Sequence, residues 1–273
     1  MPELPEVETT IRGLQKKVLK RTFVDVWTDD KKIVKKPFGE FQKELLGKKI
    51  QKIWRRGKNI IFDLSDNYSL LIHQKLTGHL LYDKWEKDRV NNYIHLKFFL
   101  DNGKVLALSD LRKFAKVELG KTEDLLKELG SLGPEPLEED FTFEKFKEVL
   151  KNRKGKIKQI LMDQEIIAGI GNIYSDEVLW RAKIHPFKDV KKLKERELKT
   201  IYQAIREVLK KAIDLHGESI SDYRDPQGRK GGFDKIRMVY RREGEKCSRC
   251  GTEIKRIKIG GRSAHFCPFC QKI

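Results

Sequence analysis

Apolar and polar residues alternate differently in the two halves of the chain. Val7, Ile11, Leu14 and Val18 recur at steps of four, three and four residues, which predicts one buried helix face from Pro5 onwards. Short runs of alternating apolar residues follow, separated by polar turns such as SDN and DNG, which is typical of an antiparallel β-sandwich or barrel. The runs cover residues 22–27, 48–54, 59–64, 69–76, 93–100, 104–109 and 114–119.

Helical periodicity begins after GSLGPEPLEED (130–140), whose glycines, prolines and acids break the strand pattern. The pattern predicts helices over 141–152, over 156–169, from an N-cap at Asn172 to before Pro186, and from about Glu195 to His216. The segment 219–235 is polar and glycine-rich and is expected to be mobile. We therefore expect an α+β protein with domains over 1–130, 141–235 and 236–273, and a hinge at 131–140.

Charge points to a polyanionic partner. The chain has 59 Lys and Arg against 41 Asp and Glu, a formal net charge of +18. Such an excess favours nucleic acid over a membrane surface as partner. Heat adaptation enriches both signs of charge and does not by itself account for the imbalance. No stretch approaches the roughly 20 apolar residues of a membrane helix, and the start lacks a signal-peptide layout, so a cytoplasmic protein is expected.

All four cysteines lie near the C-terminus in two Cys-x-x-Cys pairs, Cys247 with Cys250 and Cys267 with Cys270. Four thiolates in this arrangement can enclose one tetrahedral Zn²⁺ in a closed structural site, with iron as the main rival. The residues between the pairs predict a β-ribbon with Arg262 at its tip. His265 is then expected to be structural or to face a phosphate, because four thiolates already fill the site.

Three other stretches carry basic or flexible residues suited to an anion. GIGNIYSDE (169–177) has glycines before a helix start, where backbone N–H groups can bind a phosphate, although a simple Gly C-cap and Asn N-cap would look the same. RRGKNIIF (55–62) places Lys58 at the mouth of a strand. LSDLRKF (108–114) pairs Arg112 with Phe114, which could fill the gap left by an extruded base or could lie on a plain surface.

The opening MPELPEVE has one unexplained part. Pro5 suits a first helical turn, and Glu6 and Glu8 complement the helix dipole. Neither argument accounts for Pro2 or Glu3. Once Met1 is removed, Pro2 carries an α-amine, whose ordinary pKa near 8 leaves a useful unprotonated fraction at neutral pH. A reactive N-terminal amine is therefore possible.

Taken together, PELPEVET, RRGKNIIF, LSDLRKF, DQEIIAGIGNIYSDE and GGRSAHFCPFCQ resemble the formamidopyrimidine-DNA glycosylase family, in order over the whole chain. The resemblance implies an N-terminal helix and β-sandwich, a helix–two-turns–helix domain and a C-terminal zinc finger. It also implies excision of 8-oxoguanine and formamidopyrimidines from duplex DNA, followed by cleavage of the abasic strand.

The resemblance also implies roles for individual residues. Three of them are implied to be catalytic: Pro2 matches the nucleophile, Glu3 the acid/base residue, and Lys58 the strand-borne lysine near the lesion and phosphate. The implied phosphate contacts are Lys158, Asn172 and Arg262. The implied void-filling residues are Arg112, Phe114 and Leu76, and His73 is a further implied DNA contact. Leu76, in HQKLTG (73–78), stands where the family usually has Met. The implied lesion loop contains Ser219, Ile220, Ser221 and Tyr223, and lacks an Arg expected near Ser221.

The sequence leaves two alternative functions open. A sibling with the same fold, similar to endonuclease VIII, would remove oxidised pyrimidines. A non-catalytic DNA-binding protein would keep the finger without the chemistry, although Pro2, Glu3 and Lys58 argue against that. The expected partner is double-stranded DNA with oxidised bases or abasic sites, bound by a monomer associated with the nucleoid.

Overall fold

The computed structural model describes residues 1–219 and 222–273, and the chain forms two compact units. The first contains Met1–Ser131 and Ile213–Asp234, and the second contains Leu132–Ala212 and Lys235–Ile273. The segment 213–234 thus groups with the N-terminal part, whereas the sequence-based assignment placed it with the helices. The domain limits expected from the sequence stay predictions. Among the described residues, no helix has the length and apolar character needed to cross a bilayer.

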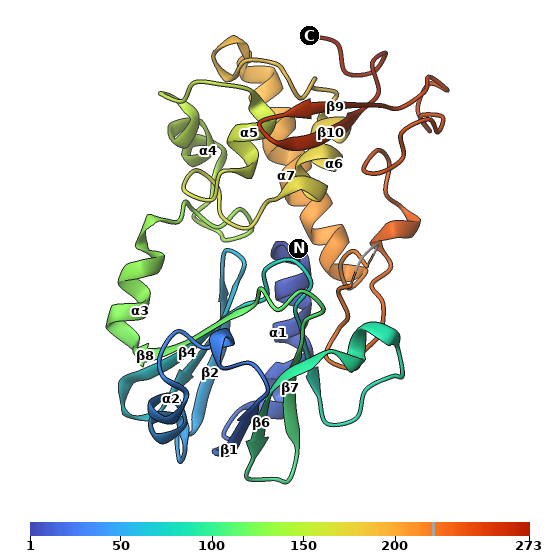
Figure 1. Cartoon of the computed structure of the whole chain (residues 1–273). Coiled ribbons are helices and arrows are strands. Elements are labelled where there is room, and N and C mark those ends of the chain that lie inside the picture. The colour runs from blue at the N-terminus through green and yellow to red at the C-terminus, as the bar shows by residue number, and fades with distance from the viewer. Residues whose placement is uncertain (220–221) are drawn as a thin grey trace. The chain divides into compact units, whose positions relative to one another are not determined.

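The first unit is a sandwich of two four-stranded antiparallel sheets (Figure 1). One sheet has the order β1 (Phe23–Thr28), β6 (Ile94–Leu100), β7 (Val105–Ser109), β5 (His79–Tyr82). The other has the order β2 (Ile50–Arg56), β3 (Asn59–Leu64), β4 (Tyr68–His73), β8 (Lys116–Lys121). The predicted sandwich is confirmed. The strand expected over 69–76 was too long, because β4 ends at His73 and the chain turns before β5.

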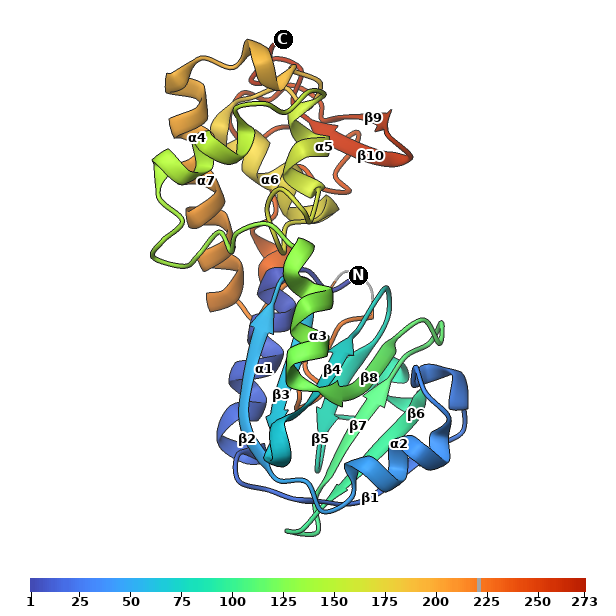
Figure 2. The same cartoon turned by 90° about the vertical axis from the view of Figure 1, so that its left-hand side faces the viewer.

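Inward-facing side chains of both sheets and one face of α1 (Leu4–Val18) make a single core. In β3, Ile60 and Phe62 point into this core, while Ile61 packs with Leu71 and Leu125 on the outer face. The continuous apolar run of β3 follows from burial on both faces. Figure 2 shows α1 beside β2 and α3 (Thr122–Glu128) over β4 and β8. Periodicity did not predict α3 or α2 (Phe38–Leu45), both of which are short.

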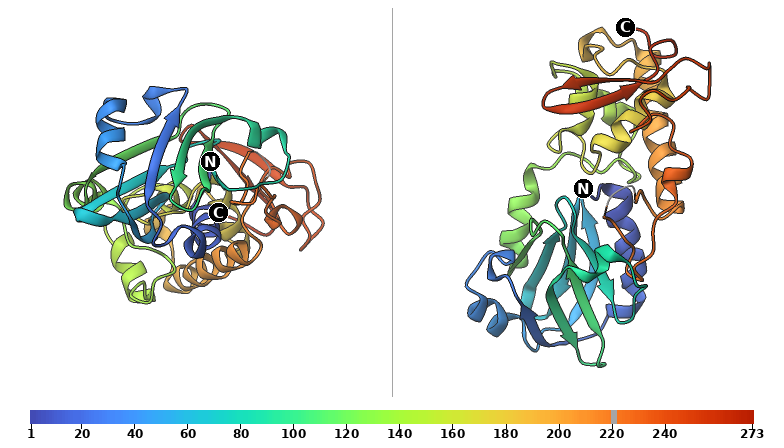
Figure 3. Two further views of the ribbon diagram at one scale, coloured as in Figure 1. Left: turned by 90° about the horizontal axis from the view of Figure 1, so that it is seen from below. Right: turned by 45° about the vertical axis from the view of Figure 1, so that its right-hand side comes forward.

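The second unit contains four helices and a hairpin (Figure 3). The helices are α4 (Phe143–Leu150), α5 (Ile157–Met162), α6 (Asn172–Ala182) and α7 (Glu195–Asp214), the last ending within the first unit. The prediction that the second helix continues to Gly169 is wrong. Gln164 donates to the carbonyls of Met162 (2.8 Å) and Ile170 (2.7 Å), and so links two turns in place of a helix. The N-cap of α6 is Gly171, one residue before the predicted Asn172.

The C-terminal hairpin consists of β9 (Lys255–Ile259) and β10 (Arg262–Phe266), paired antiparallel. Gly260 and Gly261 make the turn at φ of 51° and 74°, a region that favours glycine. The predicted β-ribbon with Arg262 at its tip is confirmed, and β10 packs on α6. Short 3₁₀ segments lie at Lys31–Ile33, Ser65–Asn67, Arg89–Asn92, Leu129–Ser131, Val190–Lys192 and Phe233–Lys235.

Candidate active site, phosphate cavity and metal centre

The N-terminus of α1 buries Pro2 and Glu3 in the first unit. Glu3 is the N-cap, and its backbone N–H donates to Glu6 Oε2 at 2.7 Å in a reciprocal capping box. This box fixes the backbone on which Pro2 stands. Glu6, whose charge complements the helix dipole, therefore also holds the backbone next to Pro2 in place.

The surroundings of the N-terminal α-amine favour its uncharged form. Burial lowers the pKa of the Met1 α-amine below its ordinary value of 8.0, and the carboxylates of Glu3 and Glu6 oppose that shift while the charge of Lys58 adds to it. Removal of Met1 would leave the Pro2 amine beside the same groups. An uncharged amine is the nucleophilic form.

Lys58 and His73 lie close together at one end of the sheet that contains β3 and β4. Lys58 is buried in the turn between β2 and β3, where Gly57 has φ of 57°, and Asn59 pairs with His73 across the strands. The Nδ1 of His73 accepts a hydrogen bond from Lys75 N at 2.9 Å, so the ring proton lies on Nε2. Burial, with Lys75 and Lys58 nearby, lowers the pKa of His73 to about 3. His73 can therefore donate from Nε2 while neutral.

The predicted void-filling residues lie on two loops that are tied together. The buried Asp110 carboxylate accepts from the backbone N–H of Phe114 and Ala115, both at 2.7 Å, and from the Thr77 hydroxyl. Phe114 is 46% exposed, and Arg112 stacks on its ring at 4.6 Å. Leu76 is half-buried on the other loop. An apolar ring held outward by a buried carboxylate is the arrangement that a wedge requires.

The predicted lesion loop is anchored to α1 at both ends. The N–H of Glu218 donates to Glu6 Oε1 at 2.8 Å, and the hydroxyl of Tyr223 donates to Glu6 O at 3.0 Å. Ser219 donates to Tyr223 O at 2.8 Å. Burial raises the pKa of Tyr223, so it stays a donor. Ile220 and Ser221 lie outside the described residues.

A cavity of about 720 Å³ lies in the second unit beside the start of α6. Asn172 and Arg262, both predicted phosphate contacts, line it with Tyr240, Arg241 and Arg256. The side-chain oxygen of Asn172 is buried without a hydrogen-bond partner among the described residues. A polar cavity with three guanidinium groups suits a phosphate.

Lys158, a predicted phosphate contact, lies buried next to Asn172. Its side chain is fully buried, with Nζ 2.5 Å from Asp176 Oδ1, and it also donates to Asn172 O at 3.3 Å. Asp176 Oδ2 in turn accepts from His265 N and Nδ1. His265, expected to be structural or to face a phosphate, takes part in this chain of bonds and also lines the cavity.

Sequence reasoning missed Tyr240, Arg241 and Glu243, which also line the cavity. Tyr240 is held by Glu177, whose buried carboxylate accepts from the N–H of Met238, Val239 and Tyr240 at 2.8, 2.9 and 2.8 Å. Burial raises the pKa of Glu177 against the effect of these bonds. The run MVYRRE (238–243) contained the signal, since an aromatic residue beside two arginines favours nucleic-acid contact.

The four cysteines converge in the second unit. The Sγ atoms of Cys247, Cys250, Cys267 and Cys270 all lie within 4.8 Å of one another. Tetrahedral zinc with Zn–S bonds of about 2.3 Å requires sulfurs about 3.8 Å apart, so these residues fit one structural Zn²⁺. Trp180 of α6 packs against this centre, and Arg249 lies 3.9 Å over its ring.

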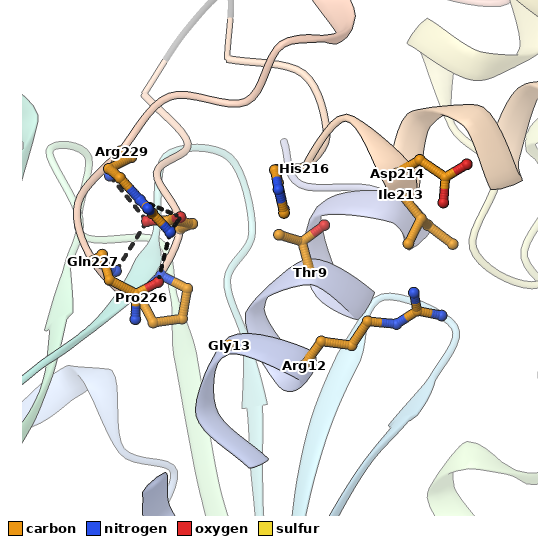
Figure 4. A pocket seen from close by; sticks show the side chains of 10 residues that line it. Thr9, Arg12, Gly13, Ile213, Asp214, His216, Pro226, Gln227 and Arg229 are labelled. Atoms are coloured by element: carbon orange, nitrogen blue, oxygen red, sulfur yellow. Dashed lines mark hydrogen bonds and ion pairs between the residues drawn. The ribbon is translucent and has the colours of Figure 1, made fainter. Parts of the chain in front are cut away.

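A second cavity, of about 290 Å³, lies in the first unit (Figure 4). It is lined by Thr9, Arg12 and Gly13 of α1, and by Ile213, Asp214, His216, Asp225, Pro226, Gln227 and Arg229. Figure 4 shows Arg229 next to Gln227, and Arg229 also forms an ion pair with Asp225 at 2.9 Å. The cavity includes none of the predicted catalytic residues.

Three family descriptions match consecutive parts of the chain. Residues 1–117 match the formamidopyrimidine-DNA glycosylase N-terminal domain, residues 132–224 match the formamidopyrimidine-DNA glycosylase H2TH domain, and residues 244–273 match the zinc finger found in FPG and IleRS. These three matches follow the same order as the sandwich, the helices and the cysteine hairpin.

Relatives match over the full length. The formamidopyrimidine-DNA glycosylase of Pelotomaculum thermopropionicum is 43% identical, with 100% of both chains covered. The structure of Lactococcus lactis Fpg with DNA containing an abasic site has 40% identity and a TM-score of 0.90, over 99% of this chain and 100% of that one. MutM in complex with carbocyclic 8-oxo-G containing DNA has 41% identity and a TM-score of 0.90, over 100% of both.

Proposed function

Because the chain belongs to the formamidopyrimidine-DNA glycosylase family, we propose that the amine of Pro2, freed by removal of Met1, is the nucleophile of base excision. The protein is a bifunctional DNA glycosylase and abasic-site lyase of base-excision repair that acts on formamidopyrimidine and 8-oxoguanine lesions. The burial of Pro2 and Glu3 beside Lys58, in a place that lowers an amine pKa, is the observation that carries the residue assignment.

The reaction follows from an uncharged secondary amine. The nitrogen of Pro2 forms a bond to the anomeric carbon of the sugar while the bond to the damaged base breaks, and the N–H proton of Pro2 passes to the departing base. Glu3 donates a proton to the sugar oxygen as the C–O bond of the ring breaks, leaving an iminium cation, the charged form of a Schiff base. This cation acidifies the adjacent sugar proton, so that β-elimination releases one phosphate and δ-elimination releases the other. The strand is then cut on both sides of the sugar.

DNA contacts are proposed for both units. In the first, Lys58 and the Nε2–H of His73 bind backbone phosphate near the lesion, while Arg112, Phe114 and Leu76 fill the void. In the second, Asn172 and Arg262 bind a phosphate in the cavity, and Lys158 positions Asn172. The loop containing Ser219, Ile220, Ser221 and Tyr223 covers the extruded base. We further infer that a cytoplasmic monomer acts on duplex DNA.

Substitution of Pro2 tests the assignment. Pro2→Gln should abolish strand cleavage at 8-oxoguanine while binding to a duplex with a tetrahydrofuran abasic analogue persists. That analogue has no aldehyde and cannot form a Schiff base. Lys17→Gln, at the far end of α1, serves as the matched control. Cleavage by the Pro2 variant would mean that another group is the nucleophile.

A further inference from the structure

The cavity that we propose for a DNA phosphate contains an anion of the protein itself. Among the described residues that line it, Glu243 carries the one carboxylate. Its Oε2 lies 3.4 Å from Nε2 of His265, and its Oε1 lies 3.4 Å from Nη1 of Arg256. The Arg256 guanidinium, which faces the cavity, is therefore already paired with a side chain that is negatively charged like a phosphate.

The backbone fixes Glu243 at this place, while its side chain remains able to leave. On one side, Arg242 N donates to Val239 O at 3.1 Å, and on the other, Gly244 N donates to Ile254 O at 3.0 Å. The Glu243 side chain is 42% exposed. It can rotate into water without burying its charge, so displacement requires no unfolding of the hairpin.

We propose that Glu243 sets the affinity for DNA by competing with the phosphate for Arg256. The inference rests on the proposed function, because it requires that the cavity binds a phosphate. Bound DNA must either displace the carboxylate or tolerate a like charge nearby. Two unit charges about 4 Å apart in water change a dissociation constant by roughly five-fold, so an effect of about three- to ten-fold is expected.

The consequence concerns undamaged DNA. A phosphate contact carries no base information, so Glu243 weakens binding to damaged and undamaged duplexes by the same factor. For a chain with net charge +18, this limits the time spent on undamaged DNA, where sequence-independent phosphate binding dominates. Glu243 is thus an affinity-setting residue and not a catalytic one.

The test measures dissociation constants for Glu243→Gln at several salt concentrations, with a tetrahydrofuran-containing duplex and an undamaged one. Glu253→Gln is the matched control, because Glu253 pairs with Lys255 at 2.7 Å near the same hairpin and does not line the cavity. Glu243→Asp keeps the charge, and Glu243→Ser gives a second neutral side chain. Zinc content and thermal melting identify a variant that fails to fold.

Both neutral variants at Glu243 should bind both duplexes about three- to ten-fold more tightly, with a salt slope steeper by about 0.9 if Arg256 gains a phosphate. Glu253→Gln should change affinity by less than about two-fold, and Glu243→Asp should resemble the parent protein. Equal affinities for Glu243→Gln and Glu253→Gln would overturn the inference.

Arg262→Ala shows whether a negative result concerns only the role of Glu243 or phosphate binding by the cavity as a whole. If Arg262→Ala weakens binding while Glu243→Gln gains nothing over its control, only the role of Glu243 is wrong. If Arg262→Ala leaves both affinities unchanged, the cavity does not bind a phosphate, and the DNA contact under the proposed function is wrong as well.

Discussion

The ammonium of Lys158 lies 2.5 Å from Oδ1 of Asp176, and neither side chain is exposed. The other oxygen of Asp176 accepts from the backbone N–H of His265 at 3.0 Å, so one carboxylate joins α5, α6 and β10. Because Lys158 also donates to Asn172 O, the pair supports the residue that lines the phosphate cavity. This contact links Asn172, which we propose binds DNA, to a buried ion pair that holds it in place.

Lys158→Met should lower the free energy of unfolding of the second unit by about 3–5 kcal/mol, because it leaves a buried carboxylate without its partner. Lys147→Met is the control, since Lys147 pairs with Glu195 at 2.7 Å on the surface and should cost less than about 1 kcal/mol. Urea unfolding followed by circular dichroism measures both. Unchanged stability with weaker DNA binding would instead support a direct phosphate contact by Lys158.

Asp110→Ala should weaken binding to abasic-analogue DNA by about ten-fold or more, as Phe114→Ala should. It removes charge-assisted bonds worth about 1.5–3 kcal/mol each, and the loop that presents Phe114 then loses its conformation. Fluorescence anisotropy with a labelled duplex measures the affinity. Asp101→Ala, at an exposed position, is the control. Full affinity in Asp110→Ala would show that the loop does not depend on this carboxylate.

The low pKa of His73 predicts a pH dependence of stability. A folded pKa of about 3 against an ordinary value of 6.5 means that the unfolded chain binds the extra proton between these two values. The stability from neutral His73 is therefore complete above about pH 6.5 and falls as the pH drops towards 3. His73→Gln should flatten the stability curve in this window. An NMR titration of His73 with a midpoint near 6.5 would contradict the prediction.

Zinc removal should weaken DNA binding without destroying the nucleophile. Cys247→Ala takes away one of four thiolates, and the hairpin with Arg262 loses the metal that holds it. We expect DNA affinity to fall by about 30-fold or more, comparable to loss of several phosphate contacts. Trapping of the N-terminal amine by a small aldehyde and borohydride should persist. Retained DNA affinity in a zinc-free variant would exclude the finger as a DNA contact.

Hydrophobic periodicity and turn residues predicted the helices, strands and turns that depend on neighbouring residues in the sequence. The α1 face, seven strand positions and the hairpin turn at Gly260 and Gly261 follow from periodicity and turn chemistry. The strand β5 was missed because His79–Tyr82 is short and buried along its whole length, with no alternation. The helix over 156–169 was predicted too long, because the side-chain bonds of Gln164 replace helical bonds after Met162.

The residues of the candidate site could likewise be predicted only where the signal lies in a continuous motif. The cysteine spacing and the positions of Pro2, Glu3 and Arg262 could be predicted because they belong to continuous motifs. The buried carboxylates Asp110, Asp176 and Glu177 could not, since a carboxylate acquires its partners only when segments distant in sequence come together. For the same reason nothing in the sequence indicated that Lys158, a predicted phosphate contact, is buried against Asp176.

The most direct test of the central claim is a borohydride trap. The protein is mixed with a duplex that holds 8-oxoguanine opposite cytosine, reduced, digested and examined by mass spectrometry. We predict one DNA adduct on the N-terminal peptide that begins at Pro2, and a loss of this adduct in Pro2→Gln. An adduct on Lys58 or another lysine, or one formed only with an oxidised pyrimidine, would contradict the assignment.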